Sequence, residues 1–150
     1  MSLYAESSAI LAWLLDEEPA ARVRELLAAQ EMIVASDLTL MECERALHRA
    51  VALGELTEAE AADRRAHLAT VAAHWTVLRI GPEVVERARQ AFPGPPVRTF
   101  DAIHLASLLV ARSAISGLAL LSVDNRIRSA AAGLGIQLQP QYAHEPKDSA

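Results

Sequence analysis

The hydrophobic residues of this chain form short uninterrupted runs, separated by longer stretches in which apolar residues recur every three or four positions. A short apolar run bounded by polar or turn-forming residues is typical of a strand that is buried on both faces of a sheet. We predict such strands at residues 3–5, 32–35, 77–80, 118–123 and 136–138.

The spacing between these runs predicts amphipathic helices. Boundary residues agree with this division: Pro19 interrupts the first helical stretch, Gly54 ends the third, and Thr57 with Glu60 has the capping-box pattern that opens a fourth. Residues 93–96 are rich in proline and predict a loop. The apolar positions that define the helices are Ile10, Leu11 and Leu14; Val23, Leu26 and Leu27; Leu38, Met41, Leu47 and Val51; and Ile103, Leu105, Leu108 and Leu109.

The alternation of strands and helices predicts an α/β fold. Strands joined through helices pair in parallel, and the helices then cover both faces of the sheet. A chain of 150 residues is suited to one domain, and we assign residues 1–139 to it. Residues 140–150 mix proline, charged residues and serine, and we expect them to form a flexible C-terminal tail.

The composition indicates which residue types form the core and in which compartment the protein is expected. Apolar residues make up 52% of the chain, but there are only two each of Phe, Trp and Tyr, so the core must consist mainly of Ala, Leu, Val and Ile. Cys43 is the only cysteine, which excludes an internal disulfide and a multi-cysteine zinc site. The N-terminus lacks a signal-peptide pattern, and no apolar stretch approaches the ~20 residues that span a bilayer. We expect a cytoplasmic protein.

The net charge of −5 argues against a protein that binds nucleic acid through electrostatics alone. It does not argue against a metal-dependent nuclease, because bound divalent ions cancel the charge of the acids around them. Arginines could still contact phosphates in such a site, although a solvated helix face or an ion pair is the alternative. The candidates are Arg45, Arg49 and Arg98.

Four acids follow or open predicted elements at one edge of the sheet. Glu6 directly follows the first apolar run, and Asp124 directly follows the fourth. Asp101 lies in the first turn of the late helix, and Glu42 lies about one turn into the helix after the second strand. Ligands of open parallel sheets bind beyond the carboxyl ends of the strands, so we expect the four carboxylates to converge.

Converging carboxylates favour a hard divalent cation. Crowded carboxylates repel one another unless a cation holds them, and oxygen ligands select Mg²⁺ or Mn²⁺ over zinc. Such ions activate water and neutralise phosphate in phosphodiester hydrolysis. A nucleotide binder of flavodoxin-like topology is disfavoured, because no glycine-rich loop follows the first strand.

Each acid also has a structural alternative. Asp124 could cap a helix, and Asp101 could stabilise a helix dipole. Glu42 could pair with Arg45 three positions on. Glu6 is harder to explain in this way, because a carboxylate at the end of a buried strand needs a partner.

Two hydroxyl residues and a histidine accompany the acids. Ser8 and Ser122 are expected to orient the carboxylates as hydrogen-bond donors, with helix capping and strand-end solvation as the alternative. His104 has apolar neighbours on both sides. We therefore expect it to be a hydrogen-bonded structural residue rather than a metal ligand or a base.

The acids lie in segments that resemble the motifs of the PIN-domain family. Residues 4–9 (YAESSA) resemble its opening strand, acid and small hydroxyl residues, and residues 38–47 (LTLMECERAL) resemble its second motif, with Glu42 as the acid. Residues 98–106 (RTFDAIHLA) are similar to the third motif almost throughout, and residues 120–124 (LLSVD) match the fourth. The motifs occur in the family's order and cover nearly the whole chain.

The resemblance implies a fold and an activity. The fold is an α/β/α sandwich with a central parallel sheet, usually dimeric, and the alanine-rich stretch 59–73 suits close helix packing between two copies. The activity is that of a VapC-like toxin of a type II toxin–antitoxin pair: a Mg²⁺- or Mn²⁺-dependent ribonuclease whose site a cognate antitoxin blocks. The arginines named above would then guide the RNA.

The resemblance also implies residue roles. Glu6, Glu42, Asp101 and Asp124 would form the catalytic set, with the metal held by Glu6, Asp101 and Asp124. The chain departs from the family at Glu6, where the usual residue is Asp. The alternative is a catalytically degenerate PIN-like module that binds RNA or a protein partner.

Overall fold

The structure, a computed structural model, describes residues 1–142 and contains one parallel sheet flanked by helices. The strands are β1 (Ser2–Ala5), β2 (Met32–Ser36), β3 (Thr76–Leu78), β4 (Ala119–Leu121) and β5 (Leu138–Gln139). The helices are α1 (Ser7–Leu14), α2 (Ala20–Ala28), α3 (Asp37–Ala52), α4 (Glu58–Ala72), α5 (Pro82–Ala88), α6 (Thr99–Ala114) and α7 (Asn125–Gly133).

The sheet has the strand order β3-β2-β1-β4-β5, and every neighbouring pair is parallel. Tyr4 of the central strand lies opposite Val34 of β2 on one side and Leu120 of β4 on the other. The chain adds β2 and β3 on one side of β1 and then crosses to add β4 and β5 on the other. The order therefore reverses between β1 and β4, the position at which open α/β sheets bind ligands.

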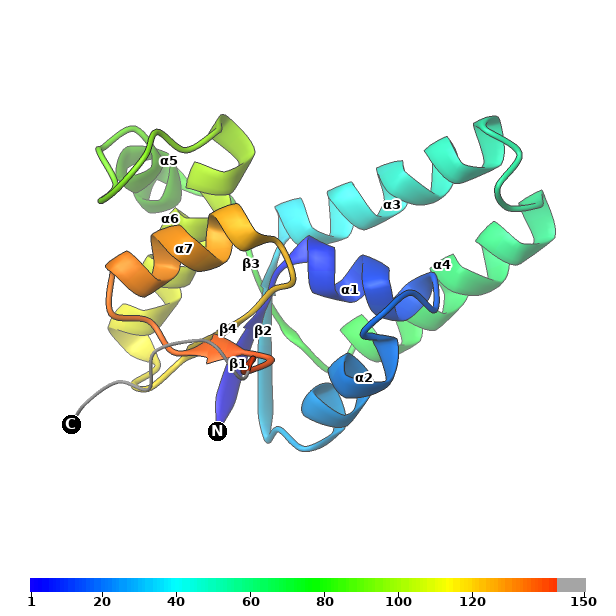
Figure 1. Cartoon of the computed structure of the whole chain (residues 1–150), viewed down its shortest axis with the longest axis horizontal. Helices are drawn as coiled ribbons and strands as arrows, with labels where there is room; N and C mark the ends of the chain where they lie inside the picture. The colour runs from blue at the N-terminus through cyan, green and yellow to red at the C-terminus, as the bar shows by residue number, and fades with distance from the viewer. Residues whose placement is uncertain (143–150) are drawn as a thin grey trace.

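Side chains of the central strand alternate between two cores. Leu3 and Ala5 pack into a core built with residues of α1 and α2, whereas Tyr4 packs into a second core with residues of α6 and α7. Alternation with a period of two is the geometry of a strand with both faces buried. Figure 1 shows α1 to α4 on one side of the sheet and α5 to α7 on the other, which confirms the predicted three-layer α/β/α sandwich.

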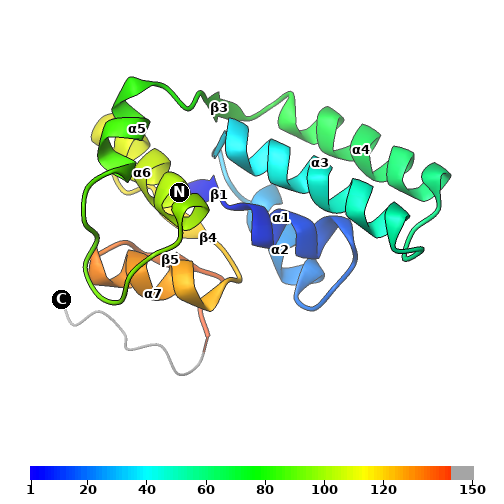
Figure 2. The same cartoon turned by 90° about the horizontal axis from the view of Figure 1, so that it is seen from above.

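Helices α3 and α4 form a long antiparallel hairpin that projects away from the sheet (Figure 2). The predicted capping box starts α4: the Thr57 hydroxyl accepts from the Glu60 backbone N–H at 3.1 Å, and the Glu60 carboxylate accepts from the Thr57 backbone N–H at 2.8 Å. Gly54 follows α3 with a φ of 74°, a left-handed conformation that costs glycine little and helps end a helix.

The predicted bounds of β1 and β2 differ from the observed ones by one residue, and those of the other three strands differ by up to two residues at one end. β3 ends at Leu78 instead of residue 80, β4 is limited to Ala119–Leu121, and β5 starts two residues later than predicted. The predicted runs were defined by hydrophobicity, but a strand extends only as far as its neighbour supplies backbone partners, and β3 and β5 are short edge strands.

The C-terminal end of the described chain contacts the sheet. Pro140 is buried, and its carbonyl accepts a hydrogen bond of 2.8 Å from the Arg128 guanidinium. The flexible tail predicted from residue 140 stays a prediction, because residues 143–150 lie outside the described part of the chain. Among residues 1–142, no helix has the length and apolar character needed to cross a membrane.

Candidate active site

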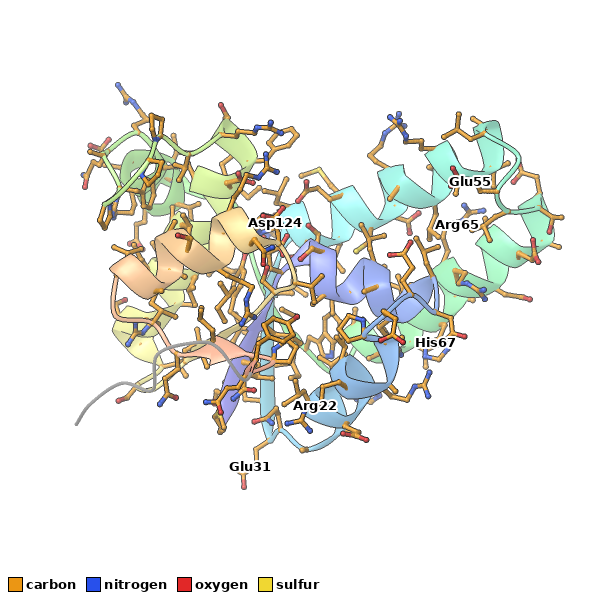
Figure 3. The ribbon with its side chains drawn as sticks, viewed as in Figure 1. Arg22, Glu31, Glu55, Arg65, His67 and Asp124 are labelled. Atoms are coloured by element: carbon orange, nitrogen blue, oxygen red, sulfur yellow. The ribbon has the colours of Figure 1, made fainter. Side chains whose placement is uncertain are left out.

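The four acids expected at the carboxyl edge of the sheet lie around the point where the strand order reverses. Glu6 follows β1, Asp124 follows β4 by three residues, and Glu42 and Asp101 lie near the starts of α3 and α6. Their charges act on one another: Asp124 and Glu6 affect Asp101, and Asp124 affects Glu42. Figure 3 shows Asp124 where α7 begins, and shows Glu31 at the opposite end of the sheet.

Helix starts position these acids. Glu6 is the N-cap of α1 and Asp124 is the N-cap of α7, whereas Asp101 lies in the first turn of α6. Glu42 lies in the second turn of α3, whose N-cap is Ser36. The positive ends of the helix dipoles therefore meet the acids and offset part of their mutual repulsion.

Glu6 is buried, with 3% of its surface exposed. Its Oε1 accepts from the Ser7 hydroxyl at 2.8 Å and from the Ser8 backbone N–H at 3.1 Å. Its Oε2 accepts from the Ser8 hydroxyl and, at 2.7 Å, from the Ser122 hydroxyl. Both expected hydroxyl partners therefore contact this carboxylate, and their role beside a metal stays a prediction.

His104 forms a hydrogen bond with the Glu42 carboxylate. The His104 Nε2 lies 2.5 Å from Glu42 Oε1, and its Nδ1 lies 3.2 Å from the Tyr4 hydroxyl. Burial raises the pKa of Tyr4 to about 12, so this hydroxyl keeps its proton. His104 is thus a hydrogen-bonded buried residue, as the apolar sequence around it predicted.

The pKa values of Glu42 and Asp124 are both lowered. Burial acts to raise the pKa of Glu42, but the hydrogen bond and the charge of His104 outweigh it. Burial likewise opposes the shift at Asp124, where hydrogen bonds from the backbone and side chain of Arg126 lower the pKa. These contacts favour the charged forms of both acids.

The pKa of Asp101 is shifted in the opposite direction. Its pKa is raised, mainly by burial and further by the negative charges of Asp124 and Glu6, while Arg126 acts against the shift. Within residues 1–142, no donor forms a hydrogen bond to its carboxylate. Burial, the missing donor and the nearby acids disfavour the charged form of this carboxylate, and the charges of Arg126 and His104 offset them only in part, so the site fits an oxygen-ligated divalent cation.

A second set of potential ligands is more compact. One atom each of Glu6, Glu42 and His104 lies within 4.8 Å of the other two. However, the Ser7 hydroxyl lies among them, at 2.8 Å from Glu6 Oε1, 2.9 Å from Glu42 Oε1 and 3.4 Å from His104 Nε2. These atoms already bind one another. Among residues 1–142, the Asp101 oxygens and Glu42 Oε2 accept no hydrogen bond, and Asp124 Oδ2 contacts only the Arg126 guanidinium, at 3.4 Å.

Two of the three structural roles considered for the acids, helix capping and a place in the first turn of a helix, are present in the structure. Asp124 caps α7 by accepting from the Arg126 and Ile127 backbone N–H groups, and Asp101 lies in the first turn of α6. Among the ion pairs of the described residues, none joins Glu42 to Arg45; Glu42 pairs with His104 instead. Capping uses one oxygen of Asp124 and leaves Oδ2 with the Arg126 guanidinium at 3.4 Å.

Sequence reasoning missed three contacts in this site: Ser7 with the two glutamates, His104 with Glu42, and Arg126 with Asp124. The contact of Ser7 with Glu42 and that of His104 with Glu42 join residues 35 and 62 positions apart, so no local pattern signals them. Arg126, two residues after an N-cap acid, was a readable signal. The arginines expected to meet phosphates are all exposed: Arg45, Arg49 and Arg98.

The chain matches the PIN domain over residues 3–133. That match covers most of the chain, and its fold and carboxylate edge agree with it. The chain belongs to the PIN domain family.

Similar proteins point to one group within this family. Ribonuclease VapC46 of Mycobacterium tuberculosis is 33% identical over 135 residues, which cover 90% of this chain and 94% of that protein. Ribonuclease VapC35 of the same organism is 40% identical over 53 residues, covering 35% of this chain and only 39% of that protein. A solved toxin–antitoxin complex from Klebsiella pneumoniae shares the fold, with a TM-score of 0.60 at 18% identity over 89% of this chain and 94% of that one.

Proposed function

We propose that this protein is a VapC-like toxin, an endoribonuclease that hydrolyses RNA phosphodiesters with Mg²⁺ or Mn²⁺. The observation that carries the proposal is the half-buried Asp101 carboxylate, which has no donor among residues 1–142 and lies in the field of two further acids. A bound cation would hold this carboxylate ionised, adding to the charges of Arg126 and His104 that already favour its ionised form. The relative VapC46, which aligns over 94% of its length, is named a ribonuclease.

Asp101, Asp124 and Glu42 would hold the ion. When bound, it supplies an activated water and neutralises the scissile phosphate. The protein's own residues do the positioning: His104 holds one oxygen of Glu42, and the start of α7 fixes Asp124. Because Arg126 lies 3.4 Å from Asp124 and 53% of its side chain is exposed, it is placed to contact an RNA phosphate entering this edge.

The proposed function implies three partners: an RNA substrate, an antitoxin and a second copy of the chain. The exposed arginines Arg45, Arg49 and Arg98 would contact the RNA backbone. A cognate antitoxin would cover the carboxylates; a structural neighbour being a toxin–antitoxin complex supports this partner. The homodimer expected from the sequence belongs to the proposal as well.

The test is cleavage of a pool of small RNAs by the purified protein with Mg²⁺ or Mn²⁺, beside an EDTA control. We expect metal-dependent cuts that the Asp101→Asn variant loses. Glu31→Gln is the matched control, because it removes one exposed carboxylate at the far end of the sheet (Figure 3) and should cut like the wild type.

Two results would count against the proposal. Cutting that persists in EDTA, or in Asp101→Asn, would exclude the carboxylate site as its source. RNA binding that survives chelation, without any cutting by the folded wild type, would favour the degenerate module that binds RNA or a protein.

A further inference from the structure

The Glu6 carboxylate is enclosed by hydrogen-bond donors. A carboxylate accepts at about four lone-pair positions; here the Ser8 and Ser122 hydroxyls donate to Oε2, and the Ser8 backbone N–H donates to Oε1. The Ser7 hydroxyl also lies at Oε1, but its single hydrogen is shared between Glu6, at 2.8 Å, and Glu42, at 2.9 Å. With 3% of the residue exposed, a cation could reach it only by displacing one of these donors.

The hydrogen-bond directions around Ser8 are fixed by its neighbours. The Ser8 hydroxyl oxygen accepts from the backbone N–H groups of Val123, at 3.0 Å, and of Asp124, at 3.2 Å. Since a hydroxyl has two lone pairs and one hydrogen, that hydrogen is left for Glu6 Oε2. Glu6 therefore reaches the Asp124 backbone through Ser8.

Ser122 provides a parallel route. Its hydroxyl shares the same Asp124 backbone N–H with Ser8, accepting from it at 3.1 Å, and donates to Glu6 Oε2 at 2.7 Å. Both routes join the end of β1 to the segment between β4 and α7. The carboxylate of an aspartate at position 6 would lie about 1.5 Å, one carbon–carbon bond, farther from the Ser8 and Ser122 hydroxyls.

We propose that Glu6 is a positioning residue that fixes the backbone of Asp124 through Ser8 and Ser122, rather than a ligand of the metal ion. This inference rests on the proposed function for its effect on metal, but the contacts that carry it do not. The glutamate that departs from the family's usual residue thus serves the geometry of Asp124, and the ion is left to Glu42, Asp101 and Asp124.

The first test is thermal unfolding of the EDTA-treated protein. Glu6→Gln should lower the Tm by several degrees, because its amide N–H₂ would face a hydroxyl that can only donate. Asp101→Asn should leave the Tm unchanged or raise it, because a ligand acid without its ion is relieved of repulsion when neutralised. A Glu6→Gln variant that gains stability in EDTA would overturn the proposal.

The second test is a double-mutant cycle read out as affinity for Mn²⁺ alone, by calorimetry. If Glu6 acts through Ser8, Glu6→Gln and Ser8→Ala should each weaken Mn²⁺ binding about tenfold, and the double variant should bind like the weaker single one. Ser8→Thr keeps the hydroxyl and should restore binding. Wild-type affinity in Ser8→Ala, together with lost binding in Glu6→Gln, would show that Glu6 is a ligand.

The two tests separate this inference from the proposed function. If Glu6→Gln does not fold, the Ser8→Ala and Ser8→Thr pair still decides the role of the network. If the wild type binds no Mn²⁺, the proposed function fails, whereas unfolding in EDTA still decides whether Glu6 stabilises this edge of the sheet.

Discussion

At the residue scale, the contact that governs the chemistry of Glu42 is its hydrogen bond with His104. The pKa of Glu42 is lowered, although burial alone would raise it. An acid with a lowered pKa stabilises the folded protein above its ordinary value of 4.5 and loses that contribution as the pH falls through the lower, folded value. The contribution of Glu42 to stability should therefore be lost in acid.

His104→Ala should raise the pKa of Glu42, because the hydrogen bond from Ser7 would then be the main contact left to oppose burial. The measurement is a ¹³C NMR titration of the glutamate side-chain carboxyls. Tyr4→Phe is the matched control: it removes the hydroxyl 3.2 Å from Nδ1 but leaves Nε2 beside Glu42, so the shift should be smaller. An unchanged Glu42 titration in His104→Ala would refute this assignment.

Asp101 gives a pH prediction of the opposite sign. Its pKa is raised, first by burial and then by Asp124 and Glu6, so the metal-free protein should gain stability as the pH falls toward the folded value. Asp101→Asn should flatten that rise, since the amide does not titrate. Urea unfolding between pH 7 and pH 4, in EDTA, checks it; identical pH profiles for variant and wild type would contradict the account.

The sequence predicted which acids would gather but not how they are held. Glu6, Asp101 and Asp124 were readable because strand ends and helix starts are local features. The position of Ser7 between two glutamates was not, because it depends on how closely α3 and α6 pack against the end of β1, and the residues involved lie 35 and 97 positions from Ser7.

At the element scale, Arg128 ties α7 to the ends of two strands. It is 3% exposed, and its guanidinium donates to the carbonyls of Ser122 at 2.8 Å, Gln139 at 3.1 Å and Pro140 at 2.8 Å. Since Ser122 also donates to Glu6, this contact supports the edge of the sheet that carries the site.

Arg128→Leu should destabilise the protein by about 2–4 kcal/mol, because it leaves three buried carbonyl acceptors without this donor. Urea denaturation measures the change. Arg22→Leu is the control: Arg22 is exposed and forms only a surface pair with Glu25 at 3.1 Å, so it should change stability by less than about 0.5 kcal/mol. Equal effects would show that the Arg128 contacts add nothing.

The helices that the periodicity did not predict are the ones with the weakest apolar signal. α5 has Val84 as its buried residue, and α7 buries Ile127 with two alanines and Arg128. Their starts carry clearer signals than their interiors: Pro82 at the first turn of α5 and Asp124 as the cap of α7. The interiors of α5 and α7 are therefore stabilised by packing against the rest of the protein rather than by a strong apolar periodicity.

At the scale of the whole molecule, the strand order explains why the site lies where it does. The reversal between β1 and β4 opens the edge of the sheet, and four helices begin around it. Alternation of strands and helices predicted a parallel sheet, but the order of strands depends on long-range pairing that periodicity does not encode. The PIN resemblance implied a central parallel sheet between two helical layers, and the order of its strands comes from the structure.

The homodimer stays a prediction with a direct measurement. Helix α4 exposes several alanines on the outside of the hairpin, including Ala62, Ala66 and Ala69, which suits close packing against a second copy. Light scattering of the purified protein at micromolar concentration should give twice the mass of the chain, and the mass of one chain at every concentration would contradict the dimer.

The end groups of the RNA fragments test the central claim most directly. If carboxylates at the edge of the sheet hold an ion that directs water at the phosphodiester, mass spectrometry of products formed in Mn²⁺ should show a linear phosphate monoester, and EDTA should abolish the products. Fragments ending in a 2′,3′-cyclic phosphate, formed equally well in EDTA, would show that the RNA's own 2′-hydroxyl attacks without a metal and would contradict the account.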